Sequence, residues 1–341
     1  MAKSYLLTIL LLCIGCSSDS PLEDDKLKVI MVFDMAGIGD RGFNDMGWAG
    51  IQRAVDELGV SATYIQSSEQ ADYVPNLSIA AEHADVVVAM GFLMIESLQK
   101  VAPLYPQTKF LFVDGEVKGE NVASFDFKSQ EGAFLAGILA GMTTKTGKVG
   151  CVMGMDIPPV RTYEVGFRAG LKVVKEKEGK TVAYLSATIG DFNDPARGKS
   201  LAQGLIGRGC DIVLQLAGNS GLGVIEAVKE APEGVYAIGA DMDQDDLAPG
   251  RVLTSILKRI DVAVFEAIRR VNDREFVPGH HLLGLKDDAS KLSSMSHTRD
   301  HIDTRTATLQ FFAREWILQS SRVPDHPEAL DGFDGSVARG W

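Results

Sequence analysis

The feature that most constrains the fold is an internal repeat. One series of short apolar runs and helical segments occurs twice, offset by about 120 to 127 residues. Several pairs in the same order are the signature of two similar units, each with β-α-β-α-β segments in sequence. We therefore predict an α/β protein with two lobes. The corresponding segments are 28–34 with 148–156, 47–59 with 166–179, Tyr64 with Tyr184, 84–91 with 210–218, and 109–115 with 235–241.

The apolar runs are short, continuous and separated by helical segments, which is typical of parallel strands buried on both faces. In such sheets, ligands bind beyond the carboxyl ends of the strands, where loops and helix N-termini converge. Two sheets that face each other form a cleft. The loops that follow the predicted strands are 35–45, 91–94, 114–117, 156–163, 190–194, 218–221 and 241–246.

The N-terminus has the layout of a secretory signal over residues 1–15. About eleven largely apolar residues follow Lys3, whereas a membrane-spanning helix needs roughly 20. A small residue, Gly15, precedes Cys16, and the chain then becomes polar. This resembles the lipobox of bacterial lipoproteins, in which the cysteine carries the lipid. We expect lipidation at Cys16 and a flexible tether over 16–27; the alternative is an ordinary secreted protein cleaved nearby.

We expect the folded part to divide into two discontinuous lobes and a tail, because the chain must pass between lobes near residues 127, 256 and 280. The predicted parts are lobe 1 at 28–127 plus 257–280, lobe 2 at 128–256 plus 281–320, and a C-terminal tail at 321–341.

Composition narrows the functional classes. The net charge of −12, with both signs interspersed, argues against nucleic-acid binding. Cys151 and Cys210 are the cysteines left in the folded part, and both lie in or beside apolar runs. We interpret them as small core residues rather than a disulfide framework.

The sequence contains no recognisable catalytic motif. His-Glu-x-x-His and Gly-x-Ser-x-Gly are absent, and GHH at 279–281 lies in a stretch interpreted as a surface connection. GNSGLGV, which begins at Gly218, is glycine-rich but is neither a dinucleotide fingerprint nor a P-loop. A tight turn for strand-to-helix packing is the favoured interpretation, although its backbone N–H groups can meet a polar ligand. We expect neither enzymatic activity, nor a metal, nor a cofactor.

The loop GDRGFNDMGWAG is the most informative segment. It places a carboxylate (Asp40), a ring (Phe43) and an amide (Asn44) together before a helix. A structural alternative is that Asn44 or Asp45 caps this helix and Phe43 packs against it.

Two further observations favour a binding site. Asp114 and Asp241 follow corresponding strands of the two repeats, and Phe192 offers a second ring from the other lobe. A carboxylate can accept protons from both hydroxyls of a diol, and facing rings suit a flat base.

The sequence resembles the basic membrane protein family of lipoproteins, the purine nucleoside receptors that serve as substrate-binding components of ABC importers. The resemblance covers nearly the whole chain from Lys28 to about Ser320. The segments that carry it are GDRGFNDMGWAGI (39–51), FKSQEGAFLAGILAG (127–141), LQLAGNSGLGVIEAVKE (214–230), IGADMDQ (238–244) and VLTSILKRID (252–261).

The resemblance implies a type I periplasmic-binding-protein fold, with two Rossmann-like lobes and a nucleoside in the cleft between them. It implies a base-binding loop at Asp40, Phe43 and Asn44, a polar contact from Asp114, and a pair, Asp241 and Lys258, that holds the ribose. With Phe192 and Gly218 added, these are the predicted ligand-binding residues.

The implied partners are a nucleoside, an ABC permease and the bacterial cell membrane, to which a lipid on Cys16 would attach the protein. The resemblance also implies a monomer that faces the periplasm or the exterior. Two other functions stay open: a sensor or adhesin lipoprotein that binds a sugar-like ligand, and a two-lobed enzyme that uses a nucleotide.

Overall fold

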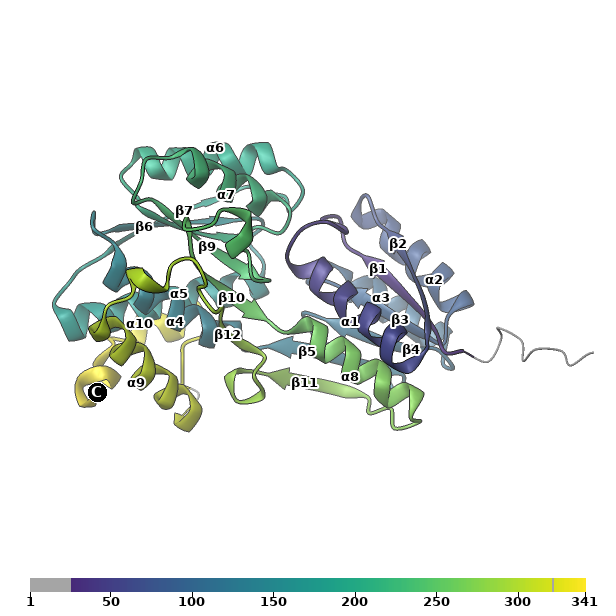
Figure 1. Cartoon of the computed structure of the whole chain (residues 1–341). Coiled ribbons are helices and arrows are strands. Elements are labelled where there is room, and N and C mark those ends of the chain that lie inside the picture. The colour runs from purple at the N-terminus through teal and green to yellow at the C-terminus, as the bar shows by residue number, and fades with distance from the viewer. Residues whose placement is uncertain (1–25, 321) are drawn as a thin grey trace, which may run out of the picture.

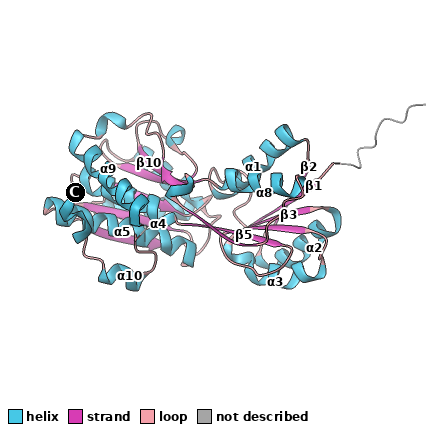
Figure 2. Cartoon of the chain, turned by 90° about the horizontal axis from the view of Figure 1, so that it is seen from below, coloured by secondary structure: helices cyan, strands magenta, loops and turns pink. Residues whose placement is uncertain are grey.

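The computed structural model describes residues 26–320 and 322–341, which form two lobes side by side (Figure 1). The predicted signal and Cys16 lie outside the described residues. Each lobe is a sheet with helices on both faces, as the view in Figure 2 shows. The predicted α/β class and two-lobed architecture are therefore confirmed.

The first lobe contains a six-stranded parallel sheet with strand order β11-β5-β4-β3-β1-β2. Helices α1 and α8 pack on one face, and α2 and α3 on the other. Every residue of β3 is buried, as expected for a strand covered on both sides. The elements are β1 (Lys28–Phe33), α1 (Phe43–Leu58), β2 (Ser61–Gln66), α2 (Tyr73–His83), β3 (Val86–Met90), α3 (Ile95–Val101), β4 (Lys109–Val113), β5 (Val122–Phe127), α8 (Ile260–Asn272) and β11 (Gly279–Leu283).

The second lobe repeats this plan, with strand order β12-β10-β9-β8-β6-β7. Only the edge strand β12 differs in direction, since it pairs antiparallel with β10. Helices α4 and α5 cover one face, and α6 and α7 the other. The elements are α4 (Ser129–Thr143), β6 (Lys148–Met153), α5 (Pro158–Glu178), β7 (Ala183–Thr188), α6 (Pro195–Gly207), β8 (Ile212–Leu216), α7 (Ser220–Glu230), β9 (Tyr236–Asp241), β10 (Val252–Lys258) and β12 (Ser290–Leu292).

The internal repeat is confirmed strand by strand, because β1 to β5 and β6 to β10 occupy the same order in the two sheets. The first helix of each unit also ends in the same way. Gly59 after α1 and Gly179 after α5 adopt left-handed conformations, with φ of 72° and 65°. Glycine adopts this region without the steric cost that a side chain would bring.

The chain passes between the lobes three times, close to the predicted positions. Helix α4 follows a strand of the first sheet but packs along α5, and α8 follows a strand of the second sheet but packs along α1. The third passage leads from β11 in the first sheet to β12 in the second. Each lobe therefore contains a helix that directly follows a strand of the other lobe.

Three details differ from the sequence expectations. Residues 281–283 belong to β11 of the first sheet, not to the second lobe, because they pair with β5. Residues 257–258 end β10 of the second sheet rather than opening the first-lobe segment. The GHH stretch is part of β11, not a connection; its exposed edge position explains its polar sequence.

The C-terminal tail is folded against the second lobe. Trp341 and Trp316 have ring centroids 6.0 Å apart, and Lys172 on α5 donates a 2.7 Å hydrogen bond to the carbonyl of Leu330. Cys151 and Cys210 are buried core residues, as predicted. Helix α9 (Thr304–Ser320) precedes the tail, whose elements are α10 (Pro327–Gly332) and a 3-10 turn (Ser336–Gly340). Other 3-10 turns span Gln70–Asp72, Phe92–Met94, Ala102–Leu104, Asp245–Leu247, Leu285–Asp287 and Arg299–His301.

Candidate functional site

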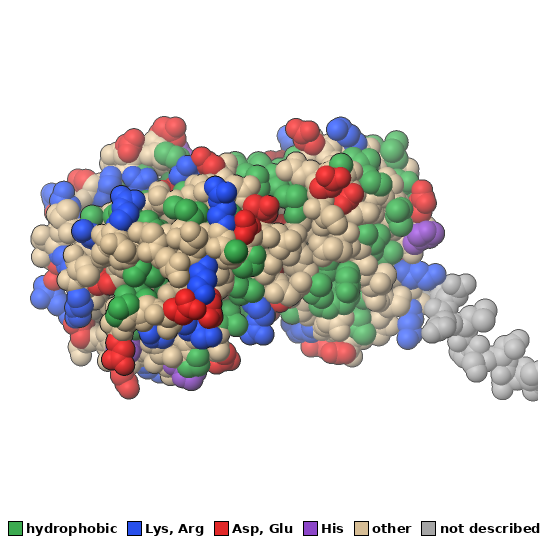
Figure 3. All heavy atoms as spheres, turned by 90° about the horizontal axis from the view of Figure 1, so that it is seen from above, with side chains coloured by type: hydrophobic (Ala, Val, Ile, Leu, Met, Phe, Trp, Pro, Cys, Tyr) green, Lys and Arg blue, Asp and Glu red, His purple; other side chains and the backbone are tan. Residues whose placement is uncertain are grey.

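A cavity of about 80 Å³ lies between the lobes, at the carboxyl ends of the strands. The structure brings all of the predicted ligand-binding residues together in its wall: Asp40, Phe43, Asn44, Asp114, Phe192, Gly218, Asp241 and Lys258. Figure 3 shows the two lobes meeting at a waist, with acidic and basic side chains mixed over the visible face.

A cluster of buried polar groups on the first lobe forms one part of the wall. The carboxylate of Asp40 accepts hydrogen bonds from the backbone N–H groups of Gly42 (2.9 Å), Asn44 (2.9 Å) and Asp45 (3.2 Å). The side chain of Asp40, rather than that of Asn44 or Asp45, therefore caps the first turn of α1. The Asn44 side chain lines the cavity and does not act as a cap.

Asp34 completes this cluster, although it was not among the residues predicted from the sequence. The Asn44 amide donates to Asp34 at 2.8 Å and to Asp40 at 3.1 Å, and its oxygen has no partner although it is buried. Burial raises the pKa of Asp40 to about 7 and also raises the pKa of Asp34. The signal for Asp34 was present, because it directly follows β1 in the same way that Asp114 follows β4.

A second polar cluster joins the lobes. The ammonium of Lys258, at the end of β10, contacts the carboxylate of Asp114 from the first lobe, and both side chains are nearly inaccessible to solvent. Asp241 accepts a 2.6 Å hydrogen bond from the Tyr163 hydroxyl. Lys258 therefore makes its ion pair with Asp114, and Asp241 has Tyr163 as its hydrogen-bond partner.

Asp114 and Asp241 are equivalent in the two repeats, and both have left-handed backbones, with φ of 72° and 67°. Burial raises the pKa of each carboxyl, that of Asp114 to about 6, while the Lys258 charge opposes the rise. The Lys258 ammonium also lies 5.2 to 5.8 Å from the ring centroids of Phe43, Phe127 and Tyr163. Cation–π attraction adds to its ion pair at this distance.

Aromatic rings enter the cavity from both lobes. Phe43 and Phe92 belong to the first lobe, and Phe192 and Tyr163 to the second. Gly154 leaves space for Phe192, since a Cβ on Gly154 would lie 2.3 Å from a Phe192 ring atom. Phe92 and Tyr163 fall in the segments 91–94 and 156–163, which were selected because they follow predicted strands. No local pattern distinguished these two residues from their neighbours.

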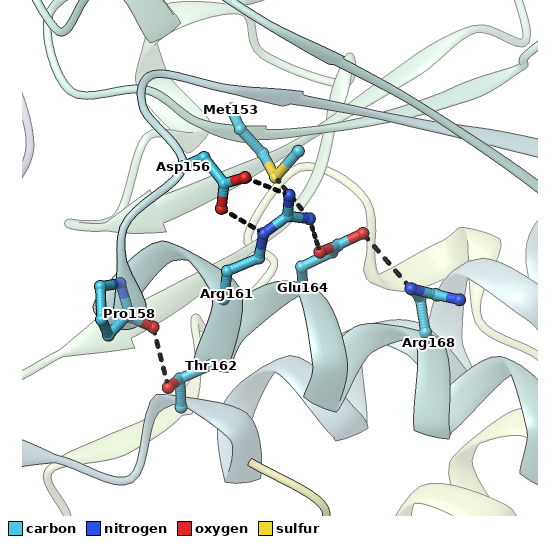
Figure 4. Close-up of polar contacts among 7 residues, drawn as sticks. All are labelled: Met153, Asp156, Pro158, Arg161, Thr162, Glu164 and Arg168. Atoms are coloured by element: carbon cyan, nitrogen blue, oxygen red, sulfur yellow. Dashed lines mark hydrogen bonds and ion pairs between the residues drawn. The ribbon is translucent and has the colours of Figure 1, made fainter. Parts of the chain in front are cut away.

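An arginine clamp secures the apolar wall of the second lobe (Figure 4). Arg161 donates to both oxygens of Asp156 (2.5 and 2.7 Å) and to Glu164 (2.5 Å). Arg168 lies 3.6 Å from the other oxygen of Glu164. The clamp ties the loop after β6 to the first turns of α5, which carry the lining residues Ile157, Pro159 and Val160.

Residues 26–320 and 322–341 contain neither a metal cluster nor a membrane-spanning helix. No group of three or more His, Cys, Asp or Glu side chains there is placed to hold a metal ion. No helix in the described part of the chain has the length and apolar character needed to cross a membrane.

Comparisons with known proteins agree with this architecture. The family described as "ABC transporter substrate-binding protein PnrA-like" (Bmp) matches residues 27–309. An uncharacterized lipoprotein of Pyrococcus abyssi is 37% identical over 295 residues, covering 83% of this chain and 73% of its own length. The ABC transporter nucleoside-binding protein BmpA of Lactococcus lactis is 32% identical over 274 residues, which cover 74% of this chain and 77% of its own length.

A solved structure has the same fold. An ABC transporter solute-binding protein from Aeropyrum pernix superposes with a TM-score of 0.76 at 32% identity, with 92% of each chain covered.

Proposed function

The chain belongs to the Bmp family of PnrA-like ABC transporter substrate-binding proteins, and from this premise we propose that its ligand is a nucleoside, with a purine base. As a member of this family it is a solute-binding protein and not an enzyme. The proposed role is to hold the nucleoside in the interlobe cavity and deliver it to the permease of an ABC importer, with the protein acting as a monomer.

The observation that carries this proposal is the combination of aromatic rings and buried carboxylates in one cavity. Phe43 and Phe192 supply flat apolar surfaces from opposite lobes, which suit stacking on a base. Asp241 and Lys258 supply an acceptor and a donor for a vicinal diol. The unpartnered Asn44 oxygen can accept a hydrogen bond from an amino or imino group of the base.

The ribose assignment is tested by the variant Asp241→Ala. A buried acceptor left without its hydroxyl partner costs roughly 1–3 kcal/mol, which is about tenfold to a hundredfold in affinity. Wild-type protein should therefore bind adenosine, guanosine or inosine more tightly than the 2′,3′-dideoxy forms, and Asp241→Ala should lose most of that difference. Isothermal titration with both ligand types measures it.

A matched control separates the ligand contact from a structural role. Tyr163→Phe removes the hydroxyl that donates to Asp241 but keeps the carboxylate, so the ribose preference should survive. If folded Asp241→Ala keeps the preference, Asp241 does not contact the ribose. If ribose or arabinose binds the wild type and nucleosides do not, the ligand is a sugar and the nucleoside assignment is wrong.

We also propose that a lipid on Cys16 anchors the protein to the membrane. Cys16 lies outside the described residues; the support is the lipobox-like sequence and the names of relatives such as the Pyrococcus abyssi lipoprotein. Cys16→Ala should move the protein to the aqueous phase in detergent partitioning or leave the precursor uncut. Unchanged partitioning of this variant would exclude the anchor.

A further inference from the structure

Two buried glutamines of the second lobe form an amide ladder that lies outside the cavity wall. Gln215 on β8 donates from Nε2 to Oε1 of Gln244 at 2.8 Å, and both side chains are almost fully buried. Gln215 accepts from the backbone N–H of Ala217 at 3.1 Å, and the backbone N–H of Gln244 donates to Ser255 at 3.0 Å. Neither glutamine lines the ligand cavity.

Backbone donors fix the direction of this ladder. Because the Ala217 N–H requires an acceptor, Oε1 of Gln215 faces it and Nε2 faces Gln244. Oε1 of Gln244 then faces Gln215, and Nε2 of Gln244 points out of the second lobe. Residues of one lobe alone therefore determine the position of this donor.

Two glycines leave the space that the ladder occupies. A Cβ on Gly221 would lie 2.0 Å from Oε1 of Gln215, and a Cβ on Gly239 would lie 2.7 Å from Oε1 of Gln244. A side chain at either glycine would therefore displace the glutamine from this position. Part of the glycine pattern in GNSGLGV and IGADMDQ is thus explained by the glutamines rather than by phosphate binding.

The acceptor for Nε2 of Gln244 belongs to the first lobe. It is the backbone carbonyl of Arg41, at 2.8 Å. Arg41 has a left-handed backbone, with φ of 48°, while its side chain is exposed. The carboxylate of Asp45 holds this conformation by accepting from the N–H groups of Gly39 (2.7 Å) and Arg41 (3.0 Å). First-lobe residues therefore determine the position of the carbonyl.

We propose that the hydrogen bond from Gln244 to the Arg41 carbonyl is an interlobe latch that favours the closed state of the protein. Each partner is oriented within its own lobe, so the bond forms when the lobes approach and is lost when they separate. Since the latch lies outside the cavity, Gln244 sets the affinity for every ligand by the same factor. It is a positioning residue, and it does not select among ligands.

The main test is Gln244→Glu in the full-length chain. The change keeps the acceptor for Gln215 but places a carboxylate oxygen against the Arg41 carbonyl, which penalises the closed state specifically. The apparent affinity falls with the population of the closed state. We expect adenosine, guanosine and inosine each to bind about tenfold or more weakly, with the ratios among the three unchanged.

Two further variants serve as controls. Gln244→Met removes the donor without adding charge, and should also weaken all three nucleosides by a common factor if Gln244→Glu does not fold. Arg41→Ala removes the exposed side chain but keeps the carbonyl, and should bind as the wild type does. Wild-type affinity in a folded Gln244 variant, or a changed order of ligand preference, would overturn the latch.

Hydrogen–deuterium exchange of the free protein gives a measurement that needs no ligand. We expect the loop 36–42 to exchange faster in Gln244→Glu than in the wild type, and equal exchange would overturn the latch. If none of the three nucleosides binds the wild type, the proposed ligand class fails, and this exchange measurement decides the latch by itself.

Discussion

At the scale of single residues, the cavity gathers four carboxyl groups, of which those of Asp40 and Asp114 are buried and those of Asp34 and Asp241 are half-buried. Asp34, Asp40, Asp114 and Asp241 all line it, and Lys258 is the cation among the lining residues. A buried carboxylate is costly unless it is paired or hydrogen-bonded. Asp114 has Lys258, Asp241 has Tyr163, and Asp40 has three backbone N–H groups. Asp34 accepts from the Asn44 amide, so each carboxylate is held by the protein before a ligand arrives.

These burials predict how stability depends on pH. The pKa of Asp40 rises from 3.8 to about 7 in the folded protein, so the folded state binds this proton more tightly than the unfolded state. Protonation of Asp40 therefore stabilises the folded state. This contribution to the free energy of unfolding is complete below about pH 4 and is lost as the pH rises through 7. Between pH 8 and pH 6, the free energy of unfolding should increase by about 1 kcal/mol from this group.

Thermal unfolding of Asp40→Asn, compared with the wild type across pH 8 to 6, measures this contribution. The variant should be less stable overall, because Asp40 holds the first turn of α1, and its pH dependence should be flatter by about that amount. An identical pH dependence in the two proteins would show that Asp40 does not take up the proton.

At the scale of elements, small residues set how closely the helices approach. Gly137 and Gly170 lie where α4 and α5 meet, and Gly223 lies where α7 meets α6. A Cβ on Gly223 would be 1.8 Å from the carbonyl oxygen of Pro195. Glycine at this position therefore allows α6 and α7 to pack closely. The gain in packing outweighs the lower helix propensity of glycine.

A pair of alanine substitutions tests this packing. Gly223→Ala should lower the free energy of unfolding by about 1–3 kcal/mol, since the helices must separate to fit the methyl group. Gly204→Ala, in α6 with nothing within 4 Å of its Cβ, should instead raise it by about 0.5–1 kcal/mol. Urea denaturation of both variants makes the comparison. Equal stabilities would mean that α6 and α7 are not packed this closely.

At the scale of the whole molecule, the lobes are joined by three passages of the chain and by a few polar contacts. The contacts include the Lys258 pair with Asp114 and the hydrogen bond from Gln244 to Arg41. Such an arrangement favours hinge motion around the cavity, because few contacts cross between the lobes. Opening requires the loss of these specific contacts.

We expect a saturating purine nucleoside to shift the protein toward the closed arrangement. Small-angle scattering should then show a smaller radius of gyration, and the melting temperature should rise because ligand binds the folded state. Cytidine and ribose serve as comparison ligands. If purine nucleosides change neither quantity, they are the wrong ligand class for this cavity.

The sequence by itself determined the two sheets and the edge at which the cavity lies. The apolar runs are visible within a few residues of sequence, and the repeat has a nearly constant offset. Strands β1 to β4 and β6 to β9 and the loops that follow them could therefore be predicted. The strand-end rule then selected loops that carry Asp40, Asp114 and Phe192, all of which line the cavity. Family resemblance added Lys258, which no local pattern marks.

Only the tertiary structure decided which of these groups touch. Lys258 pairs with Asp114 of the other lobe, Asp241 with Tyr163, and Gln244 with the Arg41 carbonyl. It also decided that residues 281–283 join the first sheet. The physical reason is that these contacts join segments far apart in the chain, and their geometry depends on how the two lobes are placed against each other. That placement leaves no periodic trace in the sequence.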